Sequence, residues 1–173
     1  MIERSLPDLF THLPDDARIW IYAADRDLNE LEENRVVEIL QEFCASWESH
    51  GRPVASGAAM VESRFAVIAG HIPGEDISGC GIDASVHALD KAHAELGIEW
   101  LPSLLVHYRD TNQVIRSVSR AQFRAGAEAG EVHLETTVFD LEMQRLGDMR
   151  AGRFEQPAGA TWHRRVFSLS CTI

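Results

Sequence analysis

The stretch Arg18-Ile-Trp-Ile-Tyr-Ala-Ala24 decides how the fold is interpreted. Ile19 and Ile21 alternate with Trp20 and Tyr22, which is typical of a strand that is apolar on both faces. We therefore predict a strand over residues 18–24 and interpret the rest of the chain outward from it.

A helix is expected directly after this strand. Asp27 is a good N-cap residue, and Glu30 follows three positions later. Helical spacing of apolar residues continues to about Glu48, before Gly51. Two strands are predicted next, over residues 54–60 and 64–70, and a loop over residues 71–79.

The second helix is marked by apolar spacing from Ile82 to Leu96, and Gly97 is placed to end it. Residues 103–109 form a predicted strand whose hairpin partner is residues 113–118. Ser119 and Gln122 form a capping box for a short third helix that ends around Gly130.

The order of elements through residue 109 is strand, helix, strand, strand, helix, strand. This is the split βαβ order of ferredoxin-like sandwiches. We therefore expect an α+β fold with a mainly antiparallel sheet, a ferredoxin-like βαββαβ core and both main helices on one face. The expected organisation is a single domain over 1–173, with the core at 12–118 and a small C-terminal strand and helix extension at 119–173. One more short strand is predicted over residues 136–139, and residues 147–160 resemble a loop.

The chain is acidic, with 27 acids, 16 bases and a net charge of −11. Eight acids and two bases give residues 25–49 a local charge of −6, whereas four Arg and one Glu give residues 150–173 a charge of +3. The overall acidity argues against nucleic acid and anionic membrane as partners, because phosphate groups are bound by basic surfaces.

Composition also bounds the cellular context and the chemistry. We find no apolar run long enough to span a membrane and no signal-peptide pattern. Three cysteines at wide spacing suit a reducing compartment, so we expect a cytoplasmic protein. Eight histidines show no H-x-x-x-H spacing, and no C-x-x-C or Walker A motif is present. We therefore expect no metal and no cofactor.

The most specific segment is residues 77–87, in which Cys80 lies between two glycines at the predicted start of the second helix. Free N–H groups and the helix dipole at such a start stabilise a thiolate or bind an anion. Asp83 and Ser85 follow in the first turns. A structural interpretation is favoured for the same pattern: the glycines shape a tight turn, Asp83 favours the helix start, and Cys80 packs as a small apolar residue.

Two readings of this segment follow. The lead reading is a non-enzymatic domain that binds a small anion or a partner at Cys80, Gly81, Asp83 and Ser85. The alternative is a thiol-dependent enzyme with Cys80 as nucleophile and His71 or His87 as base. A carboxylate beside the thiol would raise its pKa, which counts against catalysis.

Two aromatic and basic clusters could complete the anion site. Trp20 and Arg26 mark the first strand and its exit, and Trp162 and Arg164 belong to a Trp-His-Arg-Arg segment near the C-terminus. Arginine beside aromatic rings suits a carboxylate, a phosphate or a partner peptide. The tryptophans could instead attach the C-terminal tail to the sheet. A third reading of the whole chain is a protein-interaction module whose Arg-bearing C-terminal part binds an acidic partner.

Four segments together resemble a family of small bacterial proteins often labelled "ABC transporter ATPase": 17–26, 78–86, 137–140 and 162–165. The resemblance spans roughly residues 12–166 and implies kinship without implying an activity. The label does not fit the residues, since the sequence contains neither a Walker A motif nor an ABC signature.

Overall fold

The structure, a computed structural model, describes residues 6–77 and 79–170, apart from the side chains of residues 79–81. The chain divides into two compact units, labelled here unit 1 (Met1–Leu101 and Glu142–Ala151) and unit 2 (Pro102–Leu141 and Gly152–Ile173). This division differs from the single domain with a boundary at 118/119. The physical reason is that residues 142–151 return to unit 1, where Ile19 donates a backbone hydrogen bond to Gln144 at 3.1 Å.

Unit 1 contains a three-stranded antiparallel sheet of β1 (Arg18–Ala23), β5 (Phe65–His71) and β4 (Ala55–Val61), in the order β1-β5-β4. The register places Trp20 opposite Ile68 and Ile68 opposite Ala58. Alternate residues of each strand therefore share a face, as the strand prediction from residues 18–24 required.

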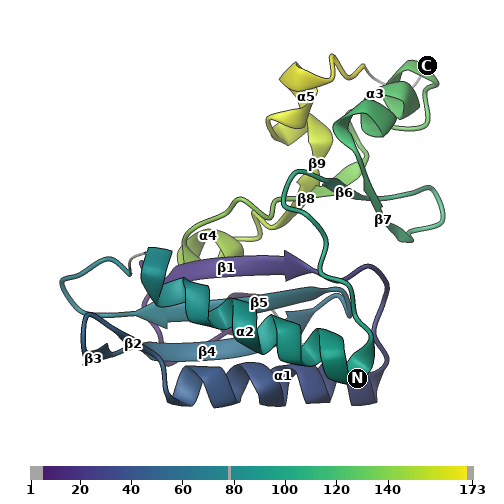
Figure 1. Cartoon of the computed structure of the whole chain (residues 1–173). Coiled ribbons are helices and arrows are strands. Elements are labelled where there is room, and N and C mark those ends of the chain that lie inside the picture. Colours follow the sequence, from purple (N-terminus) through teal and green to yellow (C-terminus); the bar gives the residue numbers. More distant parts are fainter. Residues whose placement is uncertain (1–5, 78, 171–173) are drawn as a thin grey trace. The chain divides into compact units, whose positions relative to one another are not determined.

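The two long helices of unit 1 are α1 (Glu30–Ala45) and α2 (Gly79–Leu96), and Figure 1 shows both beside the three strands. Their buried side chains join those of one sheet face in a single apolar cluster. Its large members from these elements are Val36, Ile39 and Leu40 of α1, Leu89 of α2, Met60 of β4 and Ile68 of β5. The α+β class and the antiparallel sheet are therefore confirmed.

The strand expected to complete a ferredoxin-like core lies in the other unit. After α2, unit 1 adds only an isolated antiparallel bridge between Trp100 and Ala24, and the backbone of Leu101 donates to Ala23. Pro102 follows and has no N–H to continue this ladder. The chain then enters β6 (Val106–Arg109), which pairs in the sheet of unit 2.

Short elements complete unit 1: η1 (Leu6–Asp8), β2 (Glu48–Ser49), β3 (Arg52–Pro53) and α4 (Leu146–Arg150). The expectation of a loop over residues 147–160 was wrong, because α4 buries Leu146 and Met149. Arg150 also donates to the carbonyl oxygens of Leu9, Phe10 and Leu13 at 2.7–3.1 Å.

Unit 2 contains a four-stranded antiparallel sheet in the order β7-β6-β8-β9. Its remaining elements are β7 (Ile115–Val118), α3 (Arg120–Glu128), β8 (Thr137–Phe139), β9 (Glu155–Pro157), η2 (Ala158–Ala160) and α5 (His163–Val166). The predicted capping box of Ser119 and Gln122 opens α3. A separate apolar cluster around Phe123 and Phe167 forms the core of this unit.

Candidate functional site

The segment around Cys80 begins α2, as the sequence predicts. Gly79 is the first residue of this helix, so Cys80 lies in its first turn. The side chains of Cys80 and Gly81 lie outside the described residues. Asp83 and His87 are exposed to solvent. His87 is seven residues beyond Cys80, which is about 10 Å along a helix axis and too far for a direct proton transfer.

Ser85 is fully buried and faces the sheet. Its hydroxyl donates to the carbonyl oxygen of Ile82 at 2.7 Å and lies 3.2 Å from the hydroxyl of Tyr22 on β1. Burial raises the pKa of Tyr22 above its ordinary value. These contacts attach α2 to β1, so Ser85 is positioned for packing and not for contact with a ligand.

Trp20 also contributes to packing, beside a charged neighbour. Its ring is 5.6 Å from that of Trp47 in an edge-to-face arrangement. The guanidinium carbon of Arg18 is 5.5 Å from the centre of the Trp20 ring. Trp20 therefore supports the side chain of Arg18, which the sequence analysis did not single out.

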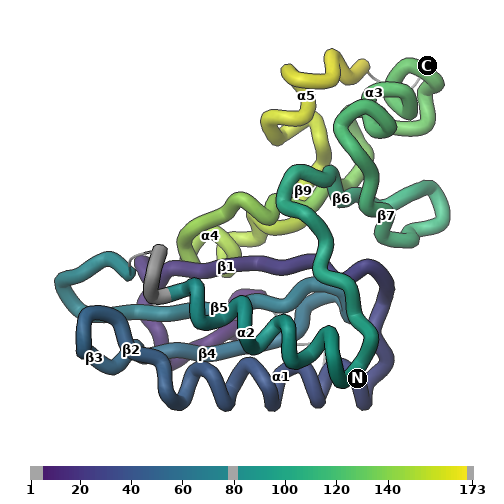
Figure 2. The backbone as a smooth tube through the Cα atoms, viewed as in Figure 1, coloured from purple at the N-terminus to yellow at the C-terminus, as the bar shows by residue number. Residues whose placement is uncertain are grey.

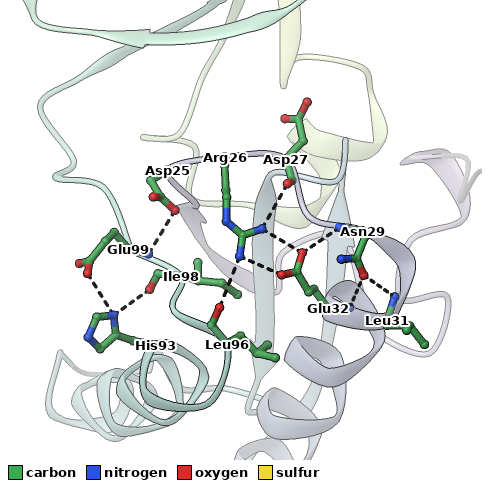
Figure 3. Close-up of polar contacts among 10 residues, drawn as sticks. All are labelled: Asp25, Arg26, Asp27, Asn29, Leu31, Glu32, His93, Leu96, Ile98 and Glu99. Carbon is green, nitrogen blue, oxygen red and sulfur yellow. Dashed lines mark hydrogen bonds and ion pairs between the residues drawn. The ribbon is translucent and has the colours of Figure 1, made fainter.

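Arg26 is at the opposite end of α2 from Cys80. Figure 3 shows its guanidinium group between Glu32 near the start of α1 and Leu96 at the end of α2. Arg26 makes two hydrogen bonds to the Glu32 carboxylate, at 2.9 and 2.8 Å, and one to the Leu96 carbonyl oxygen at 3.4 Å. The pair raises the pKa of Arg26 and lowers the pKa of Glu32.

The length of α2 separates Arg26 from the predicted site. The 18 residues of the helix extend over about 25 Å. Trp162 and Arg164 belong to unit 2. The predicted set of site residues thus falls into three places: the start of α2 with Trp20 and Ser85, the end of α2 with Arg26, and unit 2.

A polar pocket lies where the chain leaves β5 and turns toward α2, a path that Figure 2 traces. Its volume is about 260 Å³. The polar and charged lining residues are Asp16, Arg18, His71, Glu75, Asp76 and Arg145. Ile77, which also lines it, is two residues before Gly79, so the pocket is adjacent to the segment that the sequence analysis selected.

Arg18 holds a carboxylate of the protein in this pocket. Its terminal nitrogen Nη1 lies 3.1 and 3.0 Å from the two oxygens of Asp76. One of these oxygens also accepts a hydrogen bond from the Ile77 amide at 3.1 Å. The Asp76 side chain is 60% exposed whereas that of Arg18 is 22% exposed, so the ion pair is open to solvent on its carboxylate side. The Nε atom of Arg18 is buried without a hydrogen-bond partner among the described residues.

Arg145 is the second guanidinium group of the pocket. In the described part of the chain, the one hydrogen bond of its side chain goes from Nη1 to the backbone oxygen of Asp16 at 2.7 Å. Two other acids line the pocket: Glu75 pairs with Arg52 at 2.8 Å, and the Asp16 carboxylate is 3.7 Å from His71. Arg145, which is exposed, therefore keeps donors available for a ligand.

Little in the sequence points to this pocket. His71 was named as a possible base, but Arg18 and Arg145 are 127 positions apart and meet only because residues 144–146 follow the edge of β1. The one sequence signal for this pocket is Arg18, a charged residue at the start of an otherwise apolar strand. That signal identifies Arg18 without indicating its partners.

A wider depression of about 700 Å³ lies among the N-terminal segment, α1 and β4. Its polar groups bond to one another: His12 contacts the Ser56 carbonyl oxygen at 3.0 Å, and the Ser56 hydroxyl donates to the Cys44 carbonyl oxygen at 3.2 Å. Burial raises the pKa of the Cys44 thiol, which lowers its thiolate fraction. This depression is therefore a weaker candidate than the polar pocket.

Within the ranges that the structure describes, no three His, Cys, Asp or Glu residues are grouped to hold a metal ion. No helix in those ranges has the length and apolar character needed to cross a membrane. No protein-family model, curated protein or solved structure matches the chain.

Proposed function

We propose that unit 1 is a binding module for a small anion, which enters the polar pocket beside the start of α2. The observation that carries the proposal is the convergence of Arg18 and Arg145 on one hollow. Planar guanidinium groups match carboxylate and phosphate oxygens better than any other side chain.

The Asp76 carboxylate acts as an internal stand-in for the ligand. It accepts hydrogen bonds from one guanidinium nitrogen of Arg18 and from the backbone N–H of Ile77. A ligand carboxylate or phosphate that displaces Asp76 from Arg18 gains contact with Arg145 too. The exposed position of Asp76 makes this exchange inexpensive, because its carboxylate returns to water.

The thiol-enzyme alternative and the family resemblance remain predictions. Cys80 lies in the first turn of an 18-residue helix, which favours its thiolate, but its side chain lies outside the described residues and His87 is seven residues further along the helix. The resemblance to proteins labelled "ABC transporter ATPase" gives no reason to expect ATP binding here, because the sequence lacks a Walker A motif.

The melting temperature of the full chain tests the proposed anion site. Sulfate and succinate should each raise it by a few degrees more than chloride at equal ionic strength, because a ligand that binds only the folded state stabilises it. Arg145→Ala should abolish this difference. Asp76→Asn should enlarge it, since the competing charge is removed.

Arg35→Ala is the matched control. This arginine of unit 1 is fully paired with Glu95 and Glu38 on the helices and lines neither pocket, so its variant should keep the sulfate effect. An Arg145→Ala protein that responds to sulfate as the unchanged protein does would refute the site.

A further inference from the structure

The basic charge of this acidic protein is concentrated in unit 2. Residues 102–141 and 152–173 contain seven Arg and six acids, a net charge of +1, whereas unit 1 contains nine bases and 21 acids, a net charge of −12. The overall charge of −11 therefore conceals two units of different character.

Four arginines of unit 2 are exposed and have no carboxylate partner among the described residues: Arg120 and Arg124 of α3, and Arg164 and Arg165 of α5. By contrast, Arg109 pairs with Glu155 at 2.5 Å and Arg116 pairs with Asp110 at 2.7 Å in the same unit. Acids of unit 2 pair with Arg109 and Arg116 but not with these four arginines. The four guanidinium groups on α3 and α5 are therefore candidates for binding a negatively charged partner.

Aromatic rings hold two of these guanidinium groups in place. The guanidinium carbon of Arg120 is 5.2 Å from the centre of the Trp162 ring, and that of Arg124 is 5.8 Å from the centre of the Phe167 ring. Phe123 lies beneath, with its ring 4.8 Å from that of Phe167. Side chains fixed in this way lose less conformational entropy on binding, so they hold a ligand more tightly than free arginines do.

The buried His163 adds no charge to this surface. Burial, followed by the nearby Arg120, lowers the pKa of His163 to about 4, so the imidazole is neutral at physiological pH. Its ring stacks against Trp162 at 3.8 Å between centres, and its Nδ1 is 2.8 Å from the Thr161 hydroxyl. The His163 ring therefore supports the Trp162 ring by stacking. The positive charge of the surface comes from the arginines alone.

We propose that α3 and α5 form a docking surface for an acidic peptide segment of a partner protein, with Arg120, Arg124, Arg164 and Arg165 as its carboxylate-binding groups. Charge complementarity carries the assignment of the occupant. Four guanidinium groups suit a short run of Asp and Glu, and the exposed side chain of Val166 on α5 offers an apolar contact beside them in sequence. A long polyanion is disfavoured, because unit 2 as a whole carries a net charge of only +1.

Fluorescence anisotropy with the full chain tests this surface. The probe is fluorescein-labelled hexaglutamate, with hexaglutamine as the uncharged reference and decathymidylate as the nucleic-acid comparison. Hexaglutamate should bind, hexaglutamine should not, and added salt should weaken the complex. The triple variant Arg120→Gln, Arg124→Gln, Arg164→Gln should bind hexaglutamate about ten-fold less tightly, because three partly exposed ion pairs are lost.

Two further variants separate binding from folding. Arg164→Gln with Arg165→Gln touches no stacked guanidinium group and should still weaken binding measurably. Arg116→Gln, which removes an arginine already paired with Asp110, should leave the affinity within about two-fold. Equal binding of hexaglutamine, unchanged affinity in the triple variant, or tighter binding of decathymidylate would each overturn the proposal. Arginine-dependent self-association in sedimentation would also overturn it, in favour of a second copy as occupant.

Discussion

At the scale of single residues, the contact between Arg26 and Glu32 has a defined role. Glu32 accepts two hydrogen bonds from Arg26 and a third from the backbone N–H of Asn29, which closes the capping box of α1. One carboxylate thus stabilises the start of α1 and attaches Arg26, which in turn reaches the end of α2. Arg26 is better described as a structural link between two helices than as a ligand residue.

The Glu32→Gln variant tests this role through pH. The amide oxygen can still accept the Asn29 bond, so only the charge is lost. Because folding lowers the pKa of Glu32, the ion pair contributes stability above the ordinary carboxyl pKa and loses it as the pH falls through the lowered value. We expect the variant to be less stable by about 0.5–1 kcal/mol at neutral pH, and we expect this difference to be smaller at pH 3.

Urea denaturation at the two pH values measures this difference. Asp90→Asn is the control, because Asp90 is exposed on α2 and has no ion pair among the described residues. A Glu32→Gln penalty that persists unchanged at low pH would show that the capping bond, and not the charge, is what the substitution removes.

At the scale of elements, close packing of β5 depends on a glycine. A Cβ atom added to Gly70 would lie 2.7 Å from the Trp47 ring and 2.8 Å from Ile77 Cδ1. Trp47 is buried with 4% of its surface exposed, so its ring has little room to move. We expect Gly70→Ala to reduce the free energy of unfolding by about 1–3 kcal/mol.

Gly126 of α3 provides the opposite case. An added Cβ would meet Val132 at 3.5 Å, an ordinary contact, and the position is helical. Gly126→Ala should therefore raise stability by about 0.5–1 kcal/mol, chiefly by restricting the unfolded chain. Thermal denaturation followed by circular dichroism compares both variants with the unchanged protein. A neutral Gly70→Ala would mean that the Trp47 ring shifts at little cost.

The boundaries of α1 show which features the sequence predicts and which it does not. The helix itself follows from local spacing, and a capping box was expected, but Asp27 was assigned as its N-cap. In the structure the cap is Asn29, whose side chain accepts from Leu31 and Glu32. Asp27 instead binds Arg64 at 2.8 Å, a contact 37 residues away that no local pattern reveals.

The same distinction applies to the candidate site. The helix that begins near Cys80 and ends before Gly97 was predictable, because apolar spacing and turn residues are local signals. The pocket beside it was not, because Arg145 reaches β1 through an isolated bridge to Arg18, which is 127 positions away in the sequence. Long-range contacts between single charged residues therefore account for most of what the sequence alone left out.

At the scale of the whole molecule, the distribution of charge separates two kinds of surface. Several acids of unit 1 pair with bases. Glu42 on α1 pairs with Lys91 on α2 at 2.7 Å, and Glu95 on α2 pairs with Arg35 on α1 at 2.8 Å. These pairs lower the pKa values of Glu42 and Glu95. Acids nevertheless outnumber bases in unit 1, 21 to nine. Of the arginines assigned to the two proposed anion sites, only Arg18 is paired with a carboxylate among the described residues.

This excess predicts how salt affects stability. Screening weakens attraction within ion pairs and repulsion among unpaired acids alike, but 21 acids against nine bases leave repulsion dominant in unit 1. We expect the melting temperature to rise by a few degrees as sodium chloride increases from about 0.01 M to about 0.5 M. Glu48 and Asp90 are exposed and have no ion pair in the part of the chain that the structure describes. The variant Glu48→Gln with Asp90→Asn should therefore melt higher at low salt and gain less from added salt. A melting temperature that falls with salt would contradict this prediction. It would show that attraction within the ion pairs of α1 and α2 stabilises unit 1 by more than repulsion among its acids destabilises it, because screening would then remove more attraction than repulsion.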